Sequence, residues 1–345
     1  MIYFHNDYNR MCHPAVLERM QEALAQGMPG YGEDPCCGAA ADKIRKLCAR
    51  EDAAVHFLVG GTQTNLTVIA AALRPHQAVI AAESGHIHVH ETGAIEATGH
   101  KVIALPAVNG KITAEQVNDA VCNHWADPDH VHIAQPKLVY ISQSTEWGTL
   151  YSLSELEAIS RVCREHGLFL FVDGARLGYA LTAKENDVQL PDLARLCDVF
   201  YIGGTKCGTM FGEAVVITNP SLMEDFRYLI KQRGAMLAKG WLLGIQFEAL
   251  LEDGLMFDIC RKANAYADQI RATVAQLGYP LSVPGCTNQI FPVLPNALLE
   301  KLKDRFTFVS MEPVGQGSRV VRFCTSWATS QADVDDLCEA LAERG

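Results

Sequence analysis

The sequence predicts an α/β protein with a mostly parallel sheet in a large domain and a smaller α+β domain at the C-terminal end. Apolar strand-like segments alternate with helical ones between residues 54 and 217, and after Pro280 short strands and helices follow a different pattern. A chain of 345 residues is also longer than one ordinary core supports. We therefore expect a large domain over residues 1–250, including an N-terminal arm, and a small domain over residues 251–345.

The elements of the large domain are expected in a regular order. Pro14 lies near the start of a helical pattern, and the segment 27–35 is rich in turn-forming residues. Ser152 and Glu155 have the spacing of a capping box, which marks the start of a helix. The expected helices are 14–26, 39–50, 113–123 and 152–165, and one more within 60–73 that follows the glycines and threonines at the start of that segment. The expected strands are 54–59, 78–81, 101–105, 137–142, 168–173, 199–203 and 213–217.

Helices dominate the next part of the chain. They are expected over residues 221–233, 239–252 and 255–276. The segment 240–252 is apolar almost throughout, which favours packing in the core. The small domain is expected to contain strands 289–293, 307–310 and 319–324 and helices 295–304 and 330–343.

The composition argues against a nucleic-acid or membrane partner. The formal net charge is -11, and no basic block or basic amphipathic helix offsets this acidity. No signal peptide or long apolar span is evident, and the twelve cysteines include no CxxC pair. We expect buried thiols in a reducing cytoplasm, and only the adjacent Cys36 and Cys37 raise a question of reactivity.

Two ionisable residues follow predicted buried strands. One apolar run leads directly into Asp173, and another ends at Gly203-Gly204-Thr205-Lys206. The carboxyl ends of parallel strands face the crevice where such sheets bind ligands. A lysine that can form a Schiff base, beside a carboxylate that can keep a ring nitrogen protonated, is the pair that catalysis by pyridoxal 5'-phosphate (PLP) requires. We expect Lys206 and Asp173 to take these two roles.

A glycine-rich turn could hold the phosphate of such a cofactor. Gly60, Gly61 and Thr62 lie between a predicted strand and a helix, where free backbone amides and the helix dipole attract anions. The turn matches neither the P-loop nor the GxGxxG pattern. An ordinary threonine-capped helix explains it equally well when it is considered alone. The need of Lys206 for a phosphate-bearing cofactor favours the phosphate interpretation.

Three alternating histidines suggest a metal site at first. Helical spacing places only His86 and His90 on one face, and no further ligand is evident near His88. We therefore expect no metal. An aromatic ring stacked on the cofactor is the better use of one histidine, and a solvated cluster accounts for the other two.

Six short segments together resemble a known family. The segments are YGEDP (31–35), GGTQTN (60–65), HIHVHETG (86–93), VDGAR (172–176), GGTKCG (203–208) and VRFCTSW (321–327). In order and spacing they are similar to the threonine aldolase/aromatic amino acid β-eliminating lyase family of fold-type I PLP enzymes, and the resemblance covers nearly all of the chain. It implies an aspartate-aminotransferase-like fold and a homodimer or homotetramer with active sites at the subunit interface.

The resemblance also implies roles for individual residues. Lys206 would bind PLP covalently, Asp173 would pair with the ring nitrogen, and His86 would stack on the ring. Arg322 would grip the substrate carboxylate, because a planar guanidinium suits a carboxylate. The remaining expected site residues are Gly61, Thr62 and Gln63 at the phosphate, Arg176 for cofactor and substrate, Asn6 and Tyr31 for substrate, and His132 near the substrate hydroxyl.

The chain departs from the family pattern at three places. Asn6-Asp7-Tyr8 stands where the family often has Ser-Asp-Thr, and Ser142-Gln143-Ser144-Thr145-Glu146 stands where many members have Glu-Asn-Thr-His-Asn. Leu237, with Lys239 two residues later, replaces an arginine of the family's Gly-Gly-Met-Arg-Gln-Ala-Gly. These departures concern the choice of substrate more than the binding of the cofactor.

The implied activity is that of a PLP-dependent aldehyde-lyase. It would cleave a β-hydroxy-α-amino acid, L-threonine or L-allo-threonine, to glycine and an aldehyde by retro-aldol chemistry. His86 or His132 would take the hydroxyl proton, because imidazole titrates near neutral pH. The alternatives are a β-eliminating amino acid lyase, a phenylserine-type aldolase, a PLP-binding protein without catalysis, and an α/β scaffold that binds no cofactor.

Overall fold

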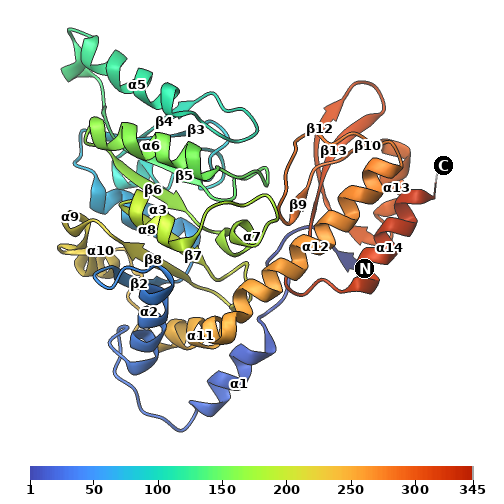
Figure 1. The fold of residues 1–345 in the computed structure, drawn as a ribbon, viewed down its shortest axis with the longest axis horizontal. Coiled ribbons are helices and arrows are strands. Elements are labelled where there is room, and N and C mark those ends of the chain that lie inside the picture. Colours follow the sequence, from blue (N-terminus) through green and yellow to red (C-terminus); the bar gives the residue numbers. More distant parts are fainter. Residues whose placement is uncertain (344–345) are drawn as a thin grey trace.

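The larger part of the molecule is built on a mostly parallel sheet (Figure 1). The structure is a computed structural model and describes residues 1–343. Within these residues the sheet has seven strands in the order β2-β8-β7-β6-β5-β3-β4, and only β8 runs antiparallel to its neighbours. The strands are β2 (Ala54–Leu58), β3 (Gln77–Ala82), β4 (Lys101–Leu105), β5 (Gln135–Ser142), β6 (Phe169–Asp173), β7 (Val199–Gly203) and β8 (Glu213–Ile217).

Helices cover both faces of this sheet (Figure 1). Successive strand residues point to opposite faces, so that Val172 packs in one core and Phe171 in the other. One core is shared with α2 (Pro35–Leu47), α5 (Ala114–Ala126), α6 (Leu153–Glu165), α7 (Leu177–Leu181), α8 (Leu190–Leu196) and α11 (Trp241–Leu251), and the other with α3 (Gly61–Ala72), α4 (His86–Val89), α9 (Pro220–Met223) and α10 (Phe226–Gln232).

A four-stranded sheet, a two-stranded sheet and three helices form the C-terminal part of the described chain. Its core contains Ile270, Val321 and Phe323. The first strand, β1 (Ile2–Tyr3), pairs with β11 (Phe306–Thr307), so the N-terminal residues pack on this part. The other elements are β9 (Gln289–Ile290), β10 (Val293–Pro295), β12 (Val309–Val314), β13 (Ser318–Cys324), α12 (Leu255–Gln276), α13 (Asn296–Leu302) and α14 (Gln331–Ala342).

Helix α12 connects the two parts. Met256 and Cys260 near its start pack in a core of the large sheet, whereas Tyr266 and Ile270 pack in the small core. One continuous helix thus contributes to both. The predicted division into domains between residues 250 and 251 stays a prediction. The last two residues of the predicted small domain, 344–345, lie outside the described part of the chain.

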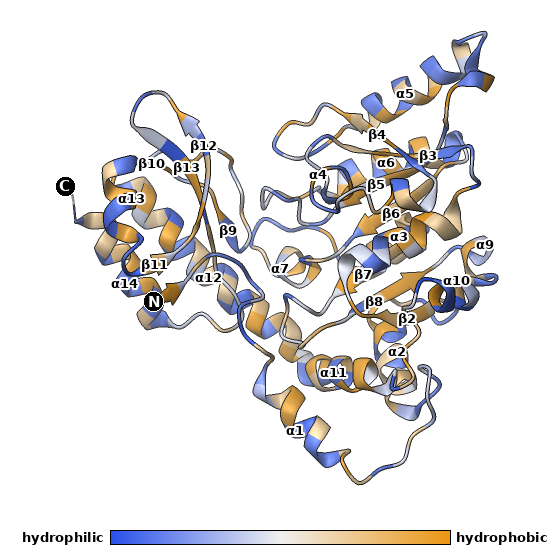
Figure 2. Cartoon of the chain, turned by 180° about the vertical axis from the view of Figure 1, so that it is seen from behind, coloured by the Kyte–Doolittle hydropathy of each residue, from blue (hydrophilic) through white to orange (hydrophobic). Residues whose placement is uncertain are grey.

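The apolar segment 240–252 forms α11, whose hydrophobic residues face several sides (Figure 2). Phe247 and Leu250 are fully buried. The prediction of core packing is therefore confirmed. The neighbouring helix α1 (Pro14–Glu22) projects from the body. Leu17 in this helix and Leu24, which follows the helix, are exposed.

The strands predicted for the large sheet agree with the seven observed strands to within about two residues. Several helices were not predicted, or were predicted with shifted ends. Helix α2 begins at Pro35 because the Asp34 side chain accepts a hydrogen bond from Cys37 N at 2.8 Å. Helices α7 and α8 are too short to produce a clear period in the sequence. The remaining short helical turns are 3-10 segments at Glu96–Thr98, His130–His132 and Glu252–Gly254.

No helix within residues 1–343 is both long and apolar enough to cross a membrane.

Candidate active site

The carboxyl ends of β6 and β7 bring Asp173 and Lys206 to one cavity. The two strands are adjacent and parallel, with Phe171 opposite Val199. The same cavity is lined by three more of the expected site residues and by polar residues of the loop after β5. The lining residues used below are Gly61, Asn65, His86, Ser144, Glu146, Asp173, Arg176, Tyr201 and Lys206.

The Asp173 carboxylate is buried but fully hydrogen-bonded. Its Oδ1 accepts from Tyr201 OH at 2.6 Å and from Ala175 N at 2.9 Å. Its Oδ2 accepts from Tyr140 OH at 2.5 Å and from Asn65 Nδ2 at 3.1 Å. Burial opposes ionisation, but the hydrogen bonds from the two tyrosines outweigh it and lower the pKa of Asp173. This side chain is thus an anion at neutral pH, as a partner of a protonated ring nitrogen must be.

A second buried carboxylate orients His86. Glu91 Oε1 lies 2.7 Å from His86 Nδ1 and also accepts a hydrogen bond from Asn65 Nδ2 at 2.7 Å. Because an ionised carboxylate only accepts hydrogen bonds, this contact places a proton on Nδ1 and fixes the orientation of the ring. The Nδ2 group of Asn65 therefore donates to both carboxylates, Glu91 and Asp173, and links them.

The turn that carries Lys206 is fixed by Glu213. The carboxylate accepts hydrogen bonds from Gly204 N at 3.0 Å and from Thr205 Oγ1 at 2.8 Å. Tyr179 OH donates to the backbone carbonyl of Lys206 at 2.6 Å. Burial raises the pKa of Glu213 to about 7, against the effect of these hydrogen bonds. The backbone at the lysine is thus held from two sides while its side chain reaches the cavity.

The glycine-rich turn begins α3 without a side-chain cap. The N-cap residue is Gly60, and no side chain bonds the first amides of this helix. The structure therefore does not support an ordinary threonine-capped helix. Gly61 lines the cavity, whereas Gln63 uses its side chain within the protein, accepting from Val59 N and donating to Arg233 O.

These features fit PLP. The uncapped start of α3 offers free amides for a phosphate, and Asp173 and Lys206 supply the carboxylate and the amine. Ser144 Oγ is buried in the cavity wall without a hydrogen-bond partner among residues 1–343. A polar group of a bound cofactor would supply this atom with a partner.

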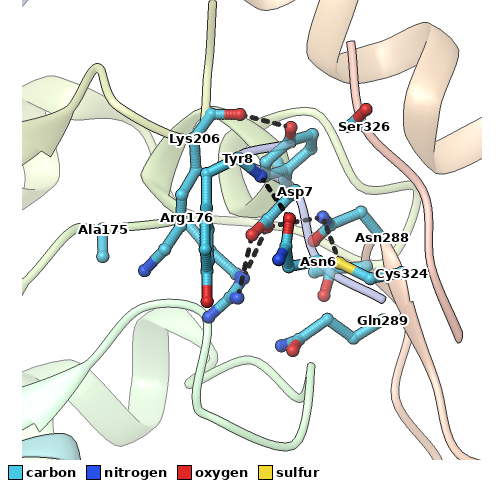
Figure 3. A network of polar contacts seen from close by, with 12 residues as sticks. Asn6, Asp7, Tyr8, Ala175, Arg176, Lys206, Asn288, Gln289, Cys324 and Ser326 are labelled. Carbon is cyan, nitrogen blue, oxygen red and sulfur yellow. Dashed lines mark hydrogen bonds and ion pairs between the residues drawn. The ribbon is translucent and has the colours of Figure 1, made fainter. Parts of the chain in front are cut away.

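A strap at the N-terminus (residues 5–8) crosses from the small part to the large part (Figure 3). Arg176 donates to Asp7 from Nε at 2.7 Å and from Nη2 at 3.1 Å, and Asn288 Nδ2 donates to Asp7 Oδ2 at 2.9 Å. Burial opposes the ionisation of Asp7, but the charges of Arg176 and Lys206 outweigh it and lower its pKa. Arg176 lines the cavity with its charge already paired, and Asn6 lies next to this pair.

Arg322 lies on β13 without an acidic partner in the described part of the chain. Its Nη1 donates to Gln289 Oε1 at 3.4 Å and its Nη2 to His5 O at 3.2 Å, while Nε is buried and unpaired within residues 1–343. Burial first, and then the charges of His86 and Arg322, lower the pKa of His90, whose ring lies 5.6 Å from that of His86. Gln289, which accepts from Arg322, also donates to the backbone carbonyl of Glu146 at 3.3 Å, so the guanidinium lies near the wall of the cavity.

The structure does not bring Tyr31 and His132 to this cavity within one chain. Tyr31 is exposed, has a φ of 63°, and lines a different cavity. His132 is exposed and precedes β5, whereas the cavity lies at the other end of that strand. A strand of eight residues spans about 26 Å. His132 is therefore too far from Lys206 to act beside it in the same chain.

Sequence reasoning missed several residues of the site. Glu91 follows His86 within the same quoted segment and could have been found as its carboxylate partner. Tyr140 and Tyr201 stand in apolar strands, where a buried hydroxyl needs a partner. Asp7 stands in the Asn6-Asp7-Tyr8 segment noted above, but nothing in the sequence indicated its pairing with Arg176, 169 positions away.

The fold and the cavity together define a PLP-dependent lyase of fold type I. A sequence profile described as "Beta-eliminating lyase" matches residues 10–296. A low specificity L-threonine aldolase from Pseudomonas sp. (strain NCIMB 10558) is 32% identical over 340 residues, which is 96% of this chain and 94% of that protein. The chain belongs to the beta-eliminating lyase family.

Solved structures agree with this assignment. The structure of Leishmania major threonine aldolase superposes with a TM-score of 0.96 at 47% identity and 99% coverage of both chains. An aspartate aminotransferase from Thermus thermophilus gives a TM-score of 0.73 at 17% identity over 99% of this chain and 91% of its own, which shows the fold alone. The predicted fold class, family and cofactor are thereby confirmed.

Replacing Asp7 with asparagine should destabilise the protein. The change Asp7→Asn leaves the Arg176 guanidinium buried without a counter-charge, and breaking such a pair costs about 3 kcal/mol or more. Urea unfolding would measure the loss. The control is Asp52→Asn, whose ion pair with Arg50 is exposed and should contribute less than about 1 kcal/mol. Equal effects of the two changes would contradict the importance of the strap.

Glu213 should make the PLP-free protein less stable as the pH rises. Its pKa is 4.5 in an ordinary environment and about 7 in the fold. The folded state therefore binds more protons in this window, and the stabilisation is complete below pH 4.5 and lost as the pH rises through 7. Between about pH 4.5 and about pH 8 the unfolding free energy should fall less in Glu213→Gln than in the parent. The difference between the two falls should be up to roughly 3 kcal/mol. Identical pH profiles for parent and variant would contradict this.

Proposed function

We propose that this chain cleaves L-threonine or L-allo-threonine to glycine and acetaldehyde as a PLP-dependent aldolase. The observation that carries the proposal is the Arg322 guanidinium, which has no acidic partner among residues 1–343 and lies near a cavity that contains Lys206 and Asp173. It offers an amino acid carboxylate a planar cation next to the reactive amine. The 47% identity to a threonine aldolase supports the choice of substrate.

Several residues at the cavity would have distinct tasks. PLP, when bound, withdraws electrons from the α-carbon of an amino acid attached to it. Lys206 Nζ would hold the cofactor, Asp173 would keep the proton on its ring nitrogen, and His86 would lie against its ring. The first amides of α3 would bind the phosphate.

Arg322 would select the bond that breaks. A carboxylate held by its guanidinium fork fixes the rotation of the substrate about its α-carbon. Fixing this rotation would determine which bond of the α-carbon is aligned for cleavage. A base near the β-hydroxyl completes the requirements for aldol cleavage.

A homodimer or homotetramer with its sites at the subunit interface is the proposed assembly. The N-terminal arm (residues 8–31), whose helix α1 projects from the body (Figure 2), has exposed large apolar side chains that a second copy would cover. These are Tyr8, Met11, Leu17, Leu24 and Tyr31. On this proposal Tyr31 reaches a substrate in the neighbouring subunit.

The proposed location is the cytoplasm. All twelve cysteines are free in the structure, and most of them are buried. Free buried thiols are typical of proteins in a reducing compartment.

A substrate panel tests the proposed function. Purified enzyme would be given L-threonine, L-allo-threonine, phenylserine and serine, with separate detection of aldehydes and keto acids. We expect acetaldehyde from the first two. Keto-acid release would favour a β-eliminating lyase, the chemistry in the family's description, and faster cleavage of phenylserine would favour a phenylserine-type aldolase. Lys206→Ala should lack both the yellow absorbance and the activity; cleavage by this variant at the parent rate would refute the role of the lysine.

Replacing Arg322 should weaken the binding of amino acids and leave PLP binding nearly intact. Arg322→Gln removes a charge-assisted pair, so KM should rise about 100-fold. PLP affinity, measured by absorbance titration, should change little. Arg319→Gln, on the same strand, serves as the matched control. An equal loss of substrate and PLP affinity would instead assign Arg322 to the cofactor.

A further inference from the structure

The cavity contains a glutamate that the roles above leave unused. Glu146 lies in the loop after β5 and lines the cavity together with Lys206 and Asp173. Its Oε1 accepts hydrogen bonds from Ser142 Oγ at 2.7 Å and from His86 N at 3.0 Å. Its Oε2 takes part in neither bond. The carboxyl group is thus anchored by one oxygen in the wall of the cavity.

Glu146 is also adjacent to the proposed carboxylate site. Gln289 Nε2 donates to the backbone carbonyl of Glu146 at 3.3 Å, and Gln289 Oε1 accepts from Arg322 Nη1 at 3.4 Å. One amide group therefore touches both residues. A substrate whose carboxylate lies on Arg322 and whose amine lies at Lys206 is thus held beside Glu146.

The histidines are less suited to the proton transfer. His132 lies at the opposite end of β5. His86 has Nδ1 committed to Glu91, and the proposed stacking commits its face to the cofactor ring. Burial raises the pKa of Glu146 above its ordinary value, despite the hydrogen bond from Ser142. A carboxylate with a raised pKa is a stronger base than an ordinary one.

We infer that Glu146 is the general base that takes the β-hydroxyl proton of the substrate. This inference rests on the proposed aldolase function. The hydroxyl O–H bond breaks as its proton passes to Oε2, and its electrons form the C=O bond of the leaving aldehyde. The electron pair of the Cα–Cβ bond stays on Cα, which then takes up one proton to give glycine. One proton is taken and one is returned, so the reaction needs no other reactant.

The change Glu146→Gln separates a chemical role from a structural one. The amide oxygen of glutamine can still accept from Ser142 and His86 N, but the side chain can no longer take a proton. We expect kcat for threonine cleavage to fall at least about 100-fold. The glycine affinity of the holoenzyme, measured by absorbance titration, should stay within about threefold of the parent. Exchange of the glycine α-proton in D2O should also continue, because glycine has no β-hydroxyl.

Glu157→Gln is the matched control, because it removes an exposed carboxylate far from the cavity. A second variant, Glu146→Ala, tests the base directly. Formate, a small carboxylate, should restore part of its threonine cleavage without improving glycine binding. Chloride at the same concentration should restore none.

Three outcomes would overturn the inference. The first is threonine cleavage by Glu146→Gln at the parent rate. The second is a parallel loss of cleavage, glycine binding and α-proton exchange in both Glu146 variants, which would make the residue structural. The third is an absence of rescue by formate in a Glu146→Ala enzyme that still binds glycine. Failure of the parent to release acetaldehyde would instead refute the proposed function.

Discussion

The site depends on keeping one carboxylate ionised inside the protein. Asp173 is almost completely removed from water, and an unpaired charge in that position would be neutralised. Four hydrogen bonds from groups on β5, β7, α3 and the turn after β6 prevent this. Two of the donors are the hydroxyl groups of Tyr140 and Tyr201, whose rings pack in the core beneath the site. The same two side chains therefore fill the core and keep Asp173 ionised.

The acids around Asp173 differ because their surroundings differ. Asp173 and Asp7 are surrounded by donors and cations that lower the pKa of each. Glu146 and Glu213 have fewer such partners, and burial dominates, so their pKa values rise. Neighbouring carboxyl groups with separated pKa values can hold a charge at one position and exchange a proton at another.

Local patterns in the sequence predicted the parts of the site that local structure creates. Asp173 and Lys206 each follow an apolar strand, and parallel pairing of those strands brings them together. The sequence could not show that Arg176 pairs with Asp7 or that Gln289 joins Glu146 to Arg322, because these contacts arise only when the two parts of the chain assemble. His132 was expected near the substrate from a resemblance alone, and the direction of β5 carries it to the far edge.

The path of helix α12 restricts how the protein can move. Its first turns are fixed in the core of one part and its middle in the core of the other. The strap crosses between the same two parts and ends on a residue of the cavity. A rotation of the small part would pivot about these two connections, and it would move Arg322 relative to Arg176, which belongs to the large part.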